Sequence, residues 1–286
     1  MSPQDTLTAP VESRISDREF DAVRRLVYEN FGISLSSQKK TLVVGRLQKV
    51  LRLRGFSTFG DYLHWVQEDP TGEALSELAD RISTNHTYFN REHEHFDHFA
   101  GTVLPEAIKR RTAAGDPELR VWCAGCSTGE EPYTLMMLMV EALAGAGARL
   151  KPVLLATDIS MKALQKAQAA VYPQEAVSKL PPALKNRYLI KQPGGLFRVG
   201  DPIRTQVHFR RHNLMNRVFR FRSPFDAIFC RNVMIYFDNP TRAKLVEKFA
   251  DNTVPGGYLF IGHSETINRD GGQYRYVLPA CYRKPL

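Results

Sequence analysis

Apolar residues recur at helical spacing through the first quarter of the chain. Ser16 and Glu19 form a capping-box pattern, and an apolar stripe follows them up to Gly32, which predicts a first helix. Similar patterns predict three further helices, over about 37–54, 59–66 and 73–82. We therefore expect an all-helical unit over residues 15–85, preceded over 1–14 by a polar lead-in that lacks periodicity and is expected to be disordered.

From about residue 118 the pattern changes to short β-type runs that alternate with helical segments. The clearest runs span 119–123, 153–157, 225–229 and 258–261, and helices are predicted over 132–144 and 161–170. Such alternation is typical of a parallel sheet covered by helices on both faces. We therefore expect an α/β domain over 118–286, joined to the helical unit by a linker and connecting helix over 86–117.

Two details of this domain follow from its turn residues. Pro255, Gly256 and Gly257 predict a tight turn that leads into the last of these strands. Two alternating runs between Tyr188 and Phe209 predict a small antiparallel β insertion at about 186–210, outside the main sheet.

The composition excludes several classes of protein. The chain has 286 residues, 43% hydrophobic and 24% charged, as in ordinary globular proteins. Its longest apolar stretch ends at Glu141, far short of a membrane span, so no membrane insertion is expected. The first residues lack the features of a secretion signal, and four cysteines are too few for a disulfide scaffold of this length. We expect a cytoplasmic protein.

A loop that contains Gly125 and Gly129 follows the first predicted strand and opens into a helix. Such a loop lets the backbone approach a ligand at the carboxyl end of the strand, but neither the dinucleotide fingerprint nor a P-loop is present. Glu130 and Glu131 at the helix start would repel a phosphate and attract an amine or a sulfonium. Alternatively, the two acids serve only the helix dipole.

The second predicted strand ends in Asp158, where related folds place a carboxylate that accepts ribose hydroxyls. The alternative is that Asp158 caps the helix that follows. The glycine loop and the terminal acid lie on consecutive βα units, and this combination favours an adenosine-type cofactor over either feature alone.

Other polar segments lie near the same sheet edge or resemble known sites. Residues 84–92 are dense in polar side chains and suit either a lid over a site or an interdomain linker. Segments 213–214 and 230–236 add polar groups, although a capping Asn and a core Tyr are alternatives. Cys123 and Cys126 have metal or redox spacing but no second ligand pair, so we expect small buried side chains and no metal. Three histidines do not converge on one helix face and are expected to be exposed: His93, His95 and His98.

Five motifs occur in one order: TNHTYFNRE, CSTGEEPY, ATDI, FDAIFCRNVMIYF and GGYLFIGHSE. Together they closely resemble the CheR-type chemoreceptor methyltransferases, from about Phe20 to the C-terminus. The resemblance implies a Rossmann-like methyltransferase domain that uses S-adenosyl-L-methionine and releases S-adenosyl-L-homocysteine. It also implies that the acceptors are glutamate side chains of membrane chemoreceptors, which become methyl esters during chemotactic adaptation.

The resemblance assigns roles to residues at matching positions. It implies cofactor contacts from Asn85, Thr87, Arg91, Gly125, Glu131, Asp158, Ile159, Asn213, Leu214, Arg231 and Asn232. It implies that the methyl-transfer end is formed by Arg91, Arg231 and Tyr236. Within these sets it places Asp158 on the ribose and Asn213 with Leu214 beside the adenine.

The chain carries a formal net charge of +9, which first suggests nucleic acid, anionic lipid or an acidic protein as partner. Part of this charge lies between Ser36 and Gly55, a segment without an acid. A solvated helix face is one explanation; the resemblance instead implies docking of acidic receptor methylation helices. The proposed docking residues are Lys39, Lys40, Arg46, Lys49 and Arg52.

Two alternatives to receptor methylation are kept. A nucleic-acid methyltransferase would fit the charge but lacks the Asn/Asp-Pro-Pro-aromatic motif that holds a flipped base. A cofactor-sensing adaptor would bind the receptor without turnover. Some members of the family grip a peptide at the receptor C-terminus with the β insertion; the segment from Arg187 to Val199 is shorter here, so we expect recognition without that tether.

Overall fold

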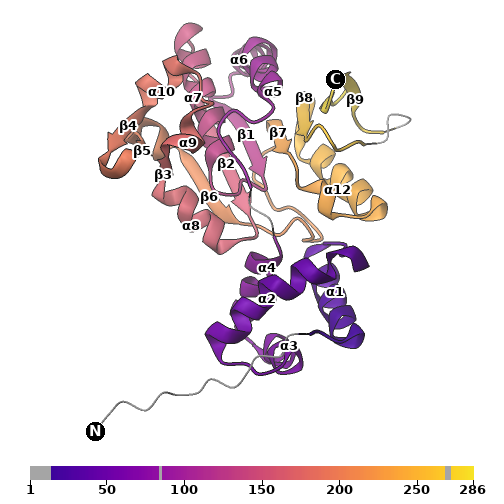
Figure 1. The fold of residues 1–286 in the computed structure, drawn as a ribbon. Coiled ribbons are helices and arrows are strands. Elements are labelled where there is room, and N and C mark those ends of the chain that lie inside the picture. The colour runs from indigo at the N-terminus through magenta and orange to yellow at the C-terminus, as the bar shows by residue number, and fades with distance from the viewer. Residues whose placement is uncertain (1–13, 84–85, 268–271) are drawn as a thin grey trace. The chain divides into compact units, whose positions relative to one another are not determined.

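The computed structural model describes residues 14–83, 86–267 and 272–286. The chain forms two compact units, Met1–Thr84 and Asn85–Leu286, which we describe separately (Figure 1). In the described ranges, no helix combines the length and the apolar character needed to cross a lipid bilayer.

The first unit is all-helical. Its elements are α1 (Asp17–Phe31), a 3-10 turn (Ser37–Lys39), α2 (Lys40–Arg54), α3 (Phe59–Glu68) and α4 (Glu73–Ile82). The capping box at α1 is present, because the Ser16 hydroxyl accepts from the Glu19 amide at 3.2 Å and the Glu19 carboxylate accepts from the Ser16 amide at 2.8 Å. The predicted first helix and its end at Gly32 are confirmed.

Arg46 of α2 forms hydrogen bonds to the end of α4. Its guanidinium donates to the carbonyls of Ile82 at 2.6 Å and of Arg81 and Ser83 at 3.3 Å. These carbonyls lie at the C-terminal end of α4, where backbone oxygens lack partners within the helix and a positive charge is favourable. Arg46 therefore stabilises the helical unit as well as contributing positive charge to it.

The substitution Arg46→Met is expected to lower the local stability of α4 by about 1–3 kcal/mol, because hydrogen bonds from a charged donor are lost. Hydrogen exchange of the α4 amides measures this change. The matched control Lys49→Met alters an exposed side chain of the same helix and should shift stability by less than about 0.5 kcal/mol. Equal effects of the two substitutions would show that the hydrogen bonds of Arg46 do not stabilise α4.

The second unit contains a seven-stranded sheet in the order β6-β2-β1-β7-β8-β10-β9, with helices on both faces (Figure 1). Its strands are β1 (Glu118–Ala124), β2 (Lys151–Asp158), β6 (Val207–Arg211), β7 (Phe225–Cys230), β8 (Thr253–Ile261), β9 (Arg275–Leu278) and β10 (Cys281–Arg283). The first five strands in this order pair in parallel, and β10 pairs antiparallel with both β8 and β9. The strand order reverses between β1 and β7, and doubly wound sheets bind ligands at such a switch point.

Alternate residues of β1 pack on opposite faces of this sheet. Val121 and Cys123 belong to the core formed with α6 (Leu104–Ala114), α7 (Glu130–Gly145) and α8 (Met161–Ala169). Trp122 points the other way and contacts Phe249 of α12 (Asn239–Asp251), with ring centroids 5.4 Å apart. Burial on both faces explains why the second half of this strand, from Val121 to Ala124, is continuously apolar.

A second, antiparallel sheet is formed by β3 (Val171–Pro173), β5 (Leu196–Val199) and β4 (Leu189–Gln192). The predicted insertion at 186–210 is therefore wrong at its end, because Val207–Arg211 pairs in parallel with β2 as an edge strand of the main sheet. An edge strand exposes alternate residues, and its pattern is the same as that of a strand in a small insertion. The short helices of this region are α9 (Gln174–Val177), α10 (Pro182–Tyr188) and α11 (Asp201–Arg204).

The tight turn predicted at Pro255–Gly257 is also wrong, because these residues lie inside β8. The pairing of β7 with β8 shifts register between Phe225 and Ala227, beside this segment. Gly256 has a φ of +73°, a left-handed conformation that suits a bulge as well as a turn. Turn-type residues here accommodate an irregular strand.

Candidate functional site

Polar residues from distant parts of the chain meet beyond the carboxyl ends of β1, β2, β7 and β8. They come from the loop after β1, from the end of β2, from the segment before α5 (His93–His98), and from the loops after β7 and β8. The carboxyl ends of parallel strands share one edge of the sheet, which explains how these segments become neighbours.

The loop after β1 folds back onto β2. The amides of Gly125 and Cys126 both donate to the Thr157 carbonyl, at 2.7 and 2.9 Å. Gly125 has a φ of +83°, and a Cβ at this position would collide with the side chain of Val233. Glycine is therefore required for the loop to come this close to the segment after β7.

Asp158 joins this loop to the start of α8. Its carboxylate accepts from the Ser127 amide at 2.8 Å and from the Ser160 amide at 2.9 Å. The helix is capped by Ser160, whose hydroxyl accepts from the Ala163 amide at 3.0 Å, so the alternative role of Asp158 as the cap of α8 is wrong. Carboxylate oxygens can each accept more than one hydrogen bond, so these contacts are compatible with a bound hydroxyl.

The two acids at the start of α7 differ. Glu130 is buried, accepts from the Thr128 hydroxyl at 2.6 Å, and has a pKa raised by burial, so it does not serve as a ligand-facing charge. Glu131 accepts from Arg231 Nη1 at 2.7 Å and from the Cys123 thiol at 3.1 Å. Glu131 remains the acid of this pair that is connected to the rest of the site.

Arg231 links three segments through a side chain that is only 2% exposed. Its Nη1 pairs with Glu131, and its Nη2 donates to Glu92 at 3.1 Å and to the Arg91 carbonyl. Its Nε is buried and has no hydrogen-bond partner in the described part of the chain. Arg231 is thus a buried cation between two carboxylates, and its place at the methyl-transfer end stays a prediction.

Glu92 is the centre of this arrangement. In addition to Arg231, it accepts from Asn232 Nδ2 at 3.2 Å and from the His263 amide at 3.3 Å. Burial alone would raise the pKa of Glu92, but the charge and hydrogen bond of Arg231 and the hydrogen bond of Asn232 outweigh it and lower this pKa. Glu92 and Asn232 both have positive φ values, +53° and +59°, a strain that often marks functional sites.

Glu265 holds the loop that carries Asn232. Its buried carboxylate accepts from the amides of Asn232 at 3.0 Å, of Ile235 at 2.9 Å and of Gly262. A Cβ on Gly262 would lie 2.9 Å from the Asn232 amide nitrogen, so only glycine permits this approach. Glu265 is a functional residue that the sequence does not predict, although it belongs to the GHSE motif.

Most of the remaining predicted site residues are half-buried. Thr87, Arg91, Ile159 and Tyr236 are half-buried, and Asn213 is half-buried with its side-chain oxygen accepting from the Met215 amide at 2.9 Å. Leu214 is buried, and its carbonyl accepts from Lys248 at 2.6 Å. Arg91 donates to the His86 carbonyl at 3.1 Å. Asn85 lies outside the described residues.

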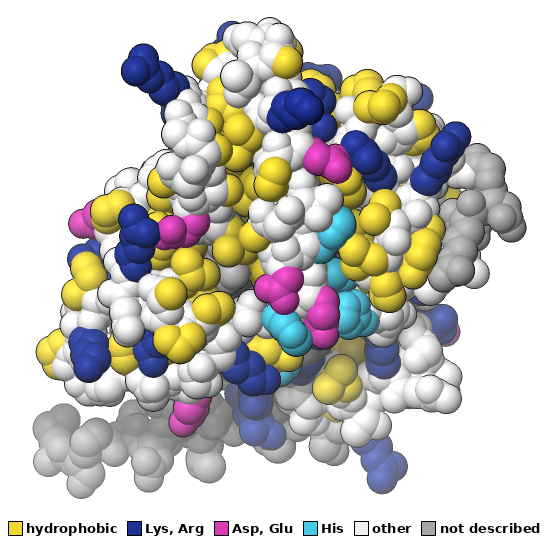
Figure 2. Space-filling view, turned by 90° about the horizontal axis from the view of Figure 1, so that it is seen from above, with side chains coloured by type: hydrophobic (Ala, Val, Ile, Leu, Met, Phe, Trp, Pro, Cys, Tyr) yellow, Lys and Arg dark blue, Asp and Glu magenta, His cyan; other side chains and the backbone are white. Residues whose placement is uncertain are grey.

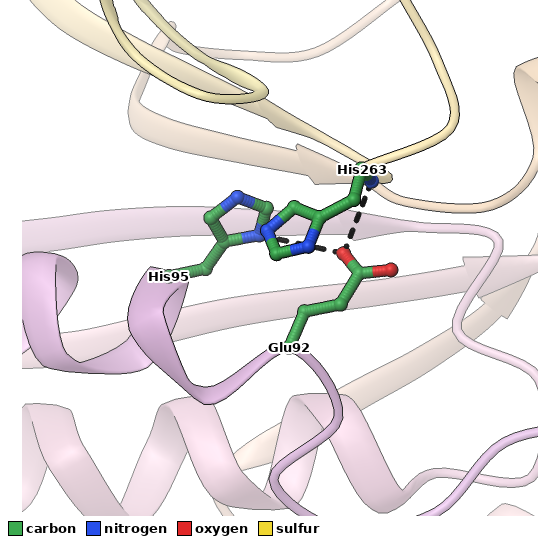
Figure 3. Close-up of side chains that lie close together, drawn as sticks. All are labelled: Glu92, His95 and His263. Carbon is green, nitrogen blue, oxygen red and sulfur yellow. Dashed lines mark hydrogen bonds and ion pairs between the residues drawn. The ribbon is translucent and has the colours of Figure 1, made fainter.

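The expectation of exposed histidines is wrong for His95, whose side chain is fully buried, and for His98, which is half-buried. Burial and the charge of Arg231 lower the pKa of His95 to about 4. His95 lies beside Glu92 and His263, as Figure 3 shows. Phe99 follows His95 by four residues and is also buried, and this helical spacing is the signal that could have revealed its position.

Both cysteines of the CxxC pattern, Cys123 and Cys126, are buried free thiols whose pKa values are raised well above the ordinary value by burial. The prediction of small buried side chains is confirmed. They belong to the strand end and the loop that shape the site.

The helical unit has a basic surface on α2 that differs from the one expected. Lys40 pairs with Asp17 at 2.6 Å, and Arg46 is turned toward α4. Lys39 is half-buried, whereas Lys49 and Arg52 are exposed and have no ion pair within the described ranges. The segment itself contains no acid, as its sequence shows, but Asp17 of α1 supplies one to Lys40.

The site fits a nucleoside ligand that carries positive charge and no phosphate. The start of α7 carries Glu131, whose charge would repel a phosphate. The loop that contains Gly125 places the Ser127 amide beside the carboxylate of Asp158. S-adenosylmethionine has a ribose, an amine and a sulfonium, and it meets these requirements.

Comparison with known proteins supplies the family. The family model described as "CheR methyltransferase, SAM binding domain" matches residues 85–279, and "CheR methyltransferase, all-alpha domain" matches residues 18–83. The chemotaxis protein methyltransferase of Borreliella burgdorferi is 42% identical over 270 residues, covering 94% of this chain and 95% of that protein. The Escherichia coli protein of the same name is 36% identical over 257 residues, covering 89% and 86%. Both domains and nearly the whole length are matched, and the chain belongs to the CheR methyltransferase family.

Proposed function

We propose that this chain transfers the methyl group of S-adenosylmethionine to glutamate side chains of chemoreceptors, forming glutamyl methyl esters and S-adenosylhomocysteine. The observation that carries the proposal is the match of both family domains, in order, to this chain. It is supported by a site in the α/β unit that suits a nucleoside ligand without phosphate groups. The relatives are named as chemotaxis protein methyltransferases. The proposed acceptors are the cytoplasmic parts of membrane receptors, so we place the reaction in the cytoplasm.

The cofactor would be held mainly by residues of the loops after β1 and β2. We assign the ribose hydroxyls to Asp158, supported by its position at the end of β2. The adenine is assigned to Asn213 and Leu214. The other proposed cofactor contacts are Asn85, Thr87, Arg91, Gly125, Glu131, Ile159 and Asn232.

The reaction needs little acid–base chemistry. The sulfonium of the cofactor supplies an electrophilic methyl group, and a glutamate with an ordinary pKa of about 4.3 is already an anionic nucleophile at neutral pH. Opposite charges are lost as the neutral ester forms, so a site with little water favours progress along the reaction. What remains for this chain is to orient the acceptor carboxylate.

We propose Arg91 and Tyr236 as the residues that orient the acceptor, because the family resemblance puts both at the methyl-transfer end and half-burial leaves part of each side chain accessible. Arg231 is assigned a positioning role instead, since its guanidinium is already bound to Glu92 and Glu131. Orientation by hydrogen bonds also avoids a strong salt bridge to the carboxylate, which would stabilise the ground state.

The exposed face of α2 is the proposed docking surface for receptor helices. It is a stripe at helical spacing formed by Leu42, Gly45, Lys49, Arg52 and Leu53. Leu42 and Leu53 are 49% and 73% exposed, so the stripe has apolar ends and a basic middle. This pattern complements an acidic amphipathic helix. Of the five docking residues expected from the sequence, Lys49 and Arg52 retain this role, and so does Lys39 at the start of α2, while Lys40 and Arg46 support the fold.

Recognition through a C-terminal receptor peptide is not part of the proposal. The turn between β4 and β5 is only the short segment Pro193–Gly195, which supports binding without this tether.

The test is methyl transfer from radiolabelled S-adenosylmethionine to membranes that contain receptors from the same organism. We expect label that is released as methanol by base, as methyl esters are. Label in nucleic acid instead would favour the nucleic-acid methyltransferase. Cofactor binding by calorimetry without any transfer would favour the adaptor, and either result would contradict the proposed function.

A further inference from the structure

We propose that Glu92, His95 and His263 form a binding site for a divalent transition-metal ion of the zinc type. The three residues come from the segment before α5, from α5 itself and from the loop after β8, and Figure 3 shows that their side chains converge. One ligand atom from each residue lies within 4.8 Å of the other two, and a small movement of the exposed His263 side chain would bring all three around one ion.

His95 is prepared as a ligand by its hydrogen bond. Its Nε2 lies 3.1 Å from the carbonyl oxygen of Pro279, which can only accept, so Nε2 carries the hydrogen in the neutral ring. Nδ1 then has a lone pair, is buried, and has no hydrogen-bond partner within the described residues. Metal-binding histidines commonly donate their second ring nitrogen to a carbonyl in this way.

The unpartnered Nδ1 points toward the other two residues. It lies 3.7 Å from Glu92 Oε2, and the His95 and His263 rings are 4.7 Å apart at their centroids. The backbone hydrogen bond from the His263 amide to the Glu92 carboxylate holds these two residues next to each other. His263 is exposed, so an ion could enter from the solvent.

The donor set selects the type of metal. Two imidazoles and one carboxylate are the protein ligands of many zinc sites, which keep a fourth position for water. Magnesium and calcium prefer oxygen ligands throughout. A zinc-type ion is therefore favoured over the alkaline-earth ions.

The surrounding charge also favours a cation, although Arg231 lies beside Glu92. Two positive charges face the carboxylates of Glu92 and Glu131: Arg231 pairs with both, and Arg91 Nε lies 3.9 Å from Glu92. Glu94, which is exposed, adds a third carboxylate near the two histidines. On this face of the molecule, histidine side chains lie next to acidic ones (Figure 2). The local charge is thus negative before an ion binds.

An ion here would join the start of α5 to the loop after β8. Zinc added to the metal-free full chain is therefore expected to bind at one site by calorimetry and to raise the midpoint of thermal unfolding, whereas magnesium is not. Cobalt should give the visible absorption bands of an ion bound by imidazole. The four cysteines are buried and should not compete in the folded protein.

The deciding variant is His263→Ala, which changes an exposed side chain and avoids the buried His95. It should bind zinc at least about tenfold more weakly than wild type and lose the cobalt bands. The matched control is His93→Ala. His93 is an exposed histidine of α5, the helix that carries His95, and it pairs with Glu94 at 3.6 Å outside the cluster. It should behave as wild type. The proposal is overturned if wild type binds no zinc, if magnesium stabilises it equally, or if the two variants bind zinc alike.

Discussion

The substitution Asp158→Ala is expected to weaken S-adenosylmethionine binding by about 100-fold or more. Hydrogen bonds to a charged group contribute about 1.5–3 kcal/mol each, and the proposed contact with two ribose hydroxyls contains two of them. A loss of about 3 kcal/mol corresponds to a factor of about 100 in the dissociation constant. Isothermal calorimetry with the full chain measures the change directly.

Asp158 also holds the Ser127 and Ser160 amides, so loss of binding could come from a changed loop instead. Ser160→Ala is the matched control: it removes the cap of α8 and should leave cofactor affinity within about threefold, at a stability cost of about 1 kcal/mol. A cofactor analogue without ribose hydroxyls separates the two causes. Wild type should bind this analogue weakly, and Asp158→Ala should bind it with the same affinity as wild type does. If Asp158→Ala weakened binding of the analogue as much as it weakens binding of S-adenosylmethionine, Asp158 would not hold the ribose.

The double substitution Lys49→Glu with Arg52→Glu is expected to reduce the rate of receptor methylation at least about tenfold, with cofactor affinity unchanged. Reversed charge in the middle of the α2 stripe would repel an acidic receptor helix, and such juxtaposed like charges cost several kcal/mol. The initial rate at receptor concentrations below saturation is the quantity to measure. Added salt should lower the wild-type rate and narrow the difference.

A control with the same change in net charge is available on α1 of the same unit. Arg18→Glu with Arg25→Glu alters two exposed arginines, seven residues apart on one helix. It should leave most of the methylation rate intact. Equal losses in both double variants would mean that net charge, and not the α2 stripe, controls receptor binding, and no loss in either would contradict docking at α2.

The fold could be predicted from local patterns wherever an element has a clear period and a cap. α4 spans the residues expected for it, and α1 has the expected capping box. β6 was placed in the wrong sheet because an exposed edge strand and an insertion strand alternate in the same way. Which strand it pairs with is decided by tertiary contacts that no local pattern contains.

The site could be predicted only in part, for the same reason. The motifs place Arg231 and Glu131 at the sheet edge, but their ion pair joins residues 100 positions apart, and the partner Glu92 is 139 positions from Arg231. His95 meets Pro279 across 184 positions. The exposure and pairing of a charged residue therefore depend on contacts that form only in the folded chain. Arg46 of α2 is another example, because its hydrogen bonds to the end of α4 are not evident from the sequence.

The most direct measurement of the central claim is to map methyl groups on receptors by mass spectrometry. Receptor-containing membranes from the same organism would be incubated with the full chain and S-adenosylmethionine, digested, and compared before and after mild base. We predict methyl esters on glutamates of the receptors' cytoplasmic helices, removed by base and strongly reduced with Lys49→Glu and Arg52→Glu. Methyl groups that resist base, or receptors without methyl groups while the cofactor is bound, would contradict the claim.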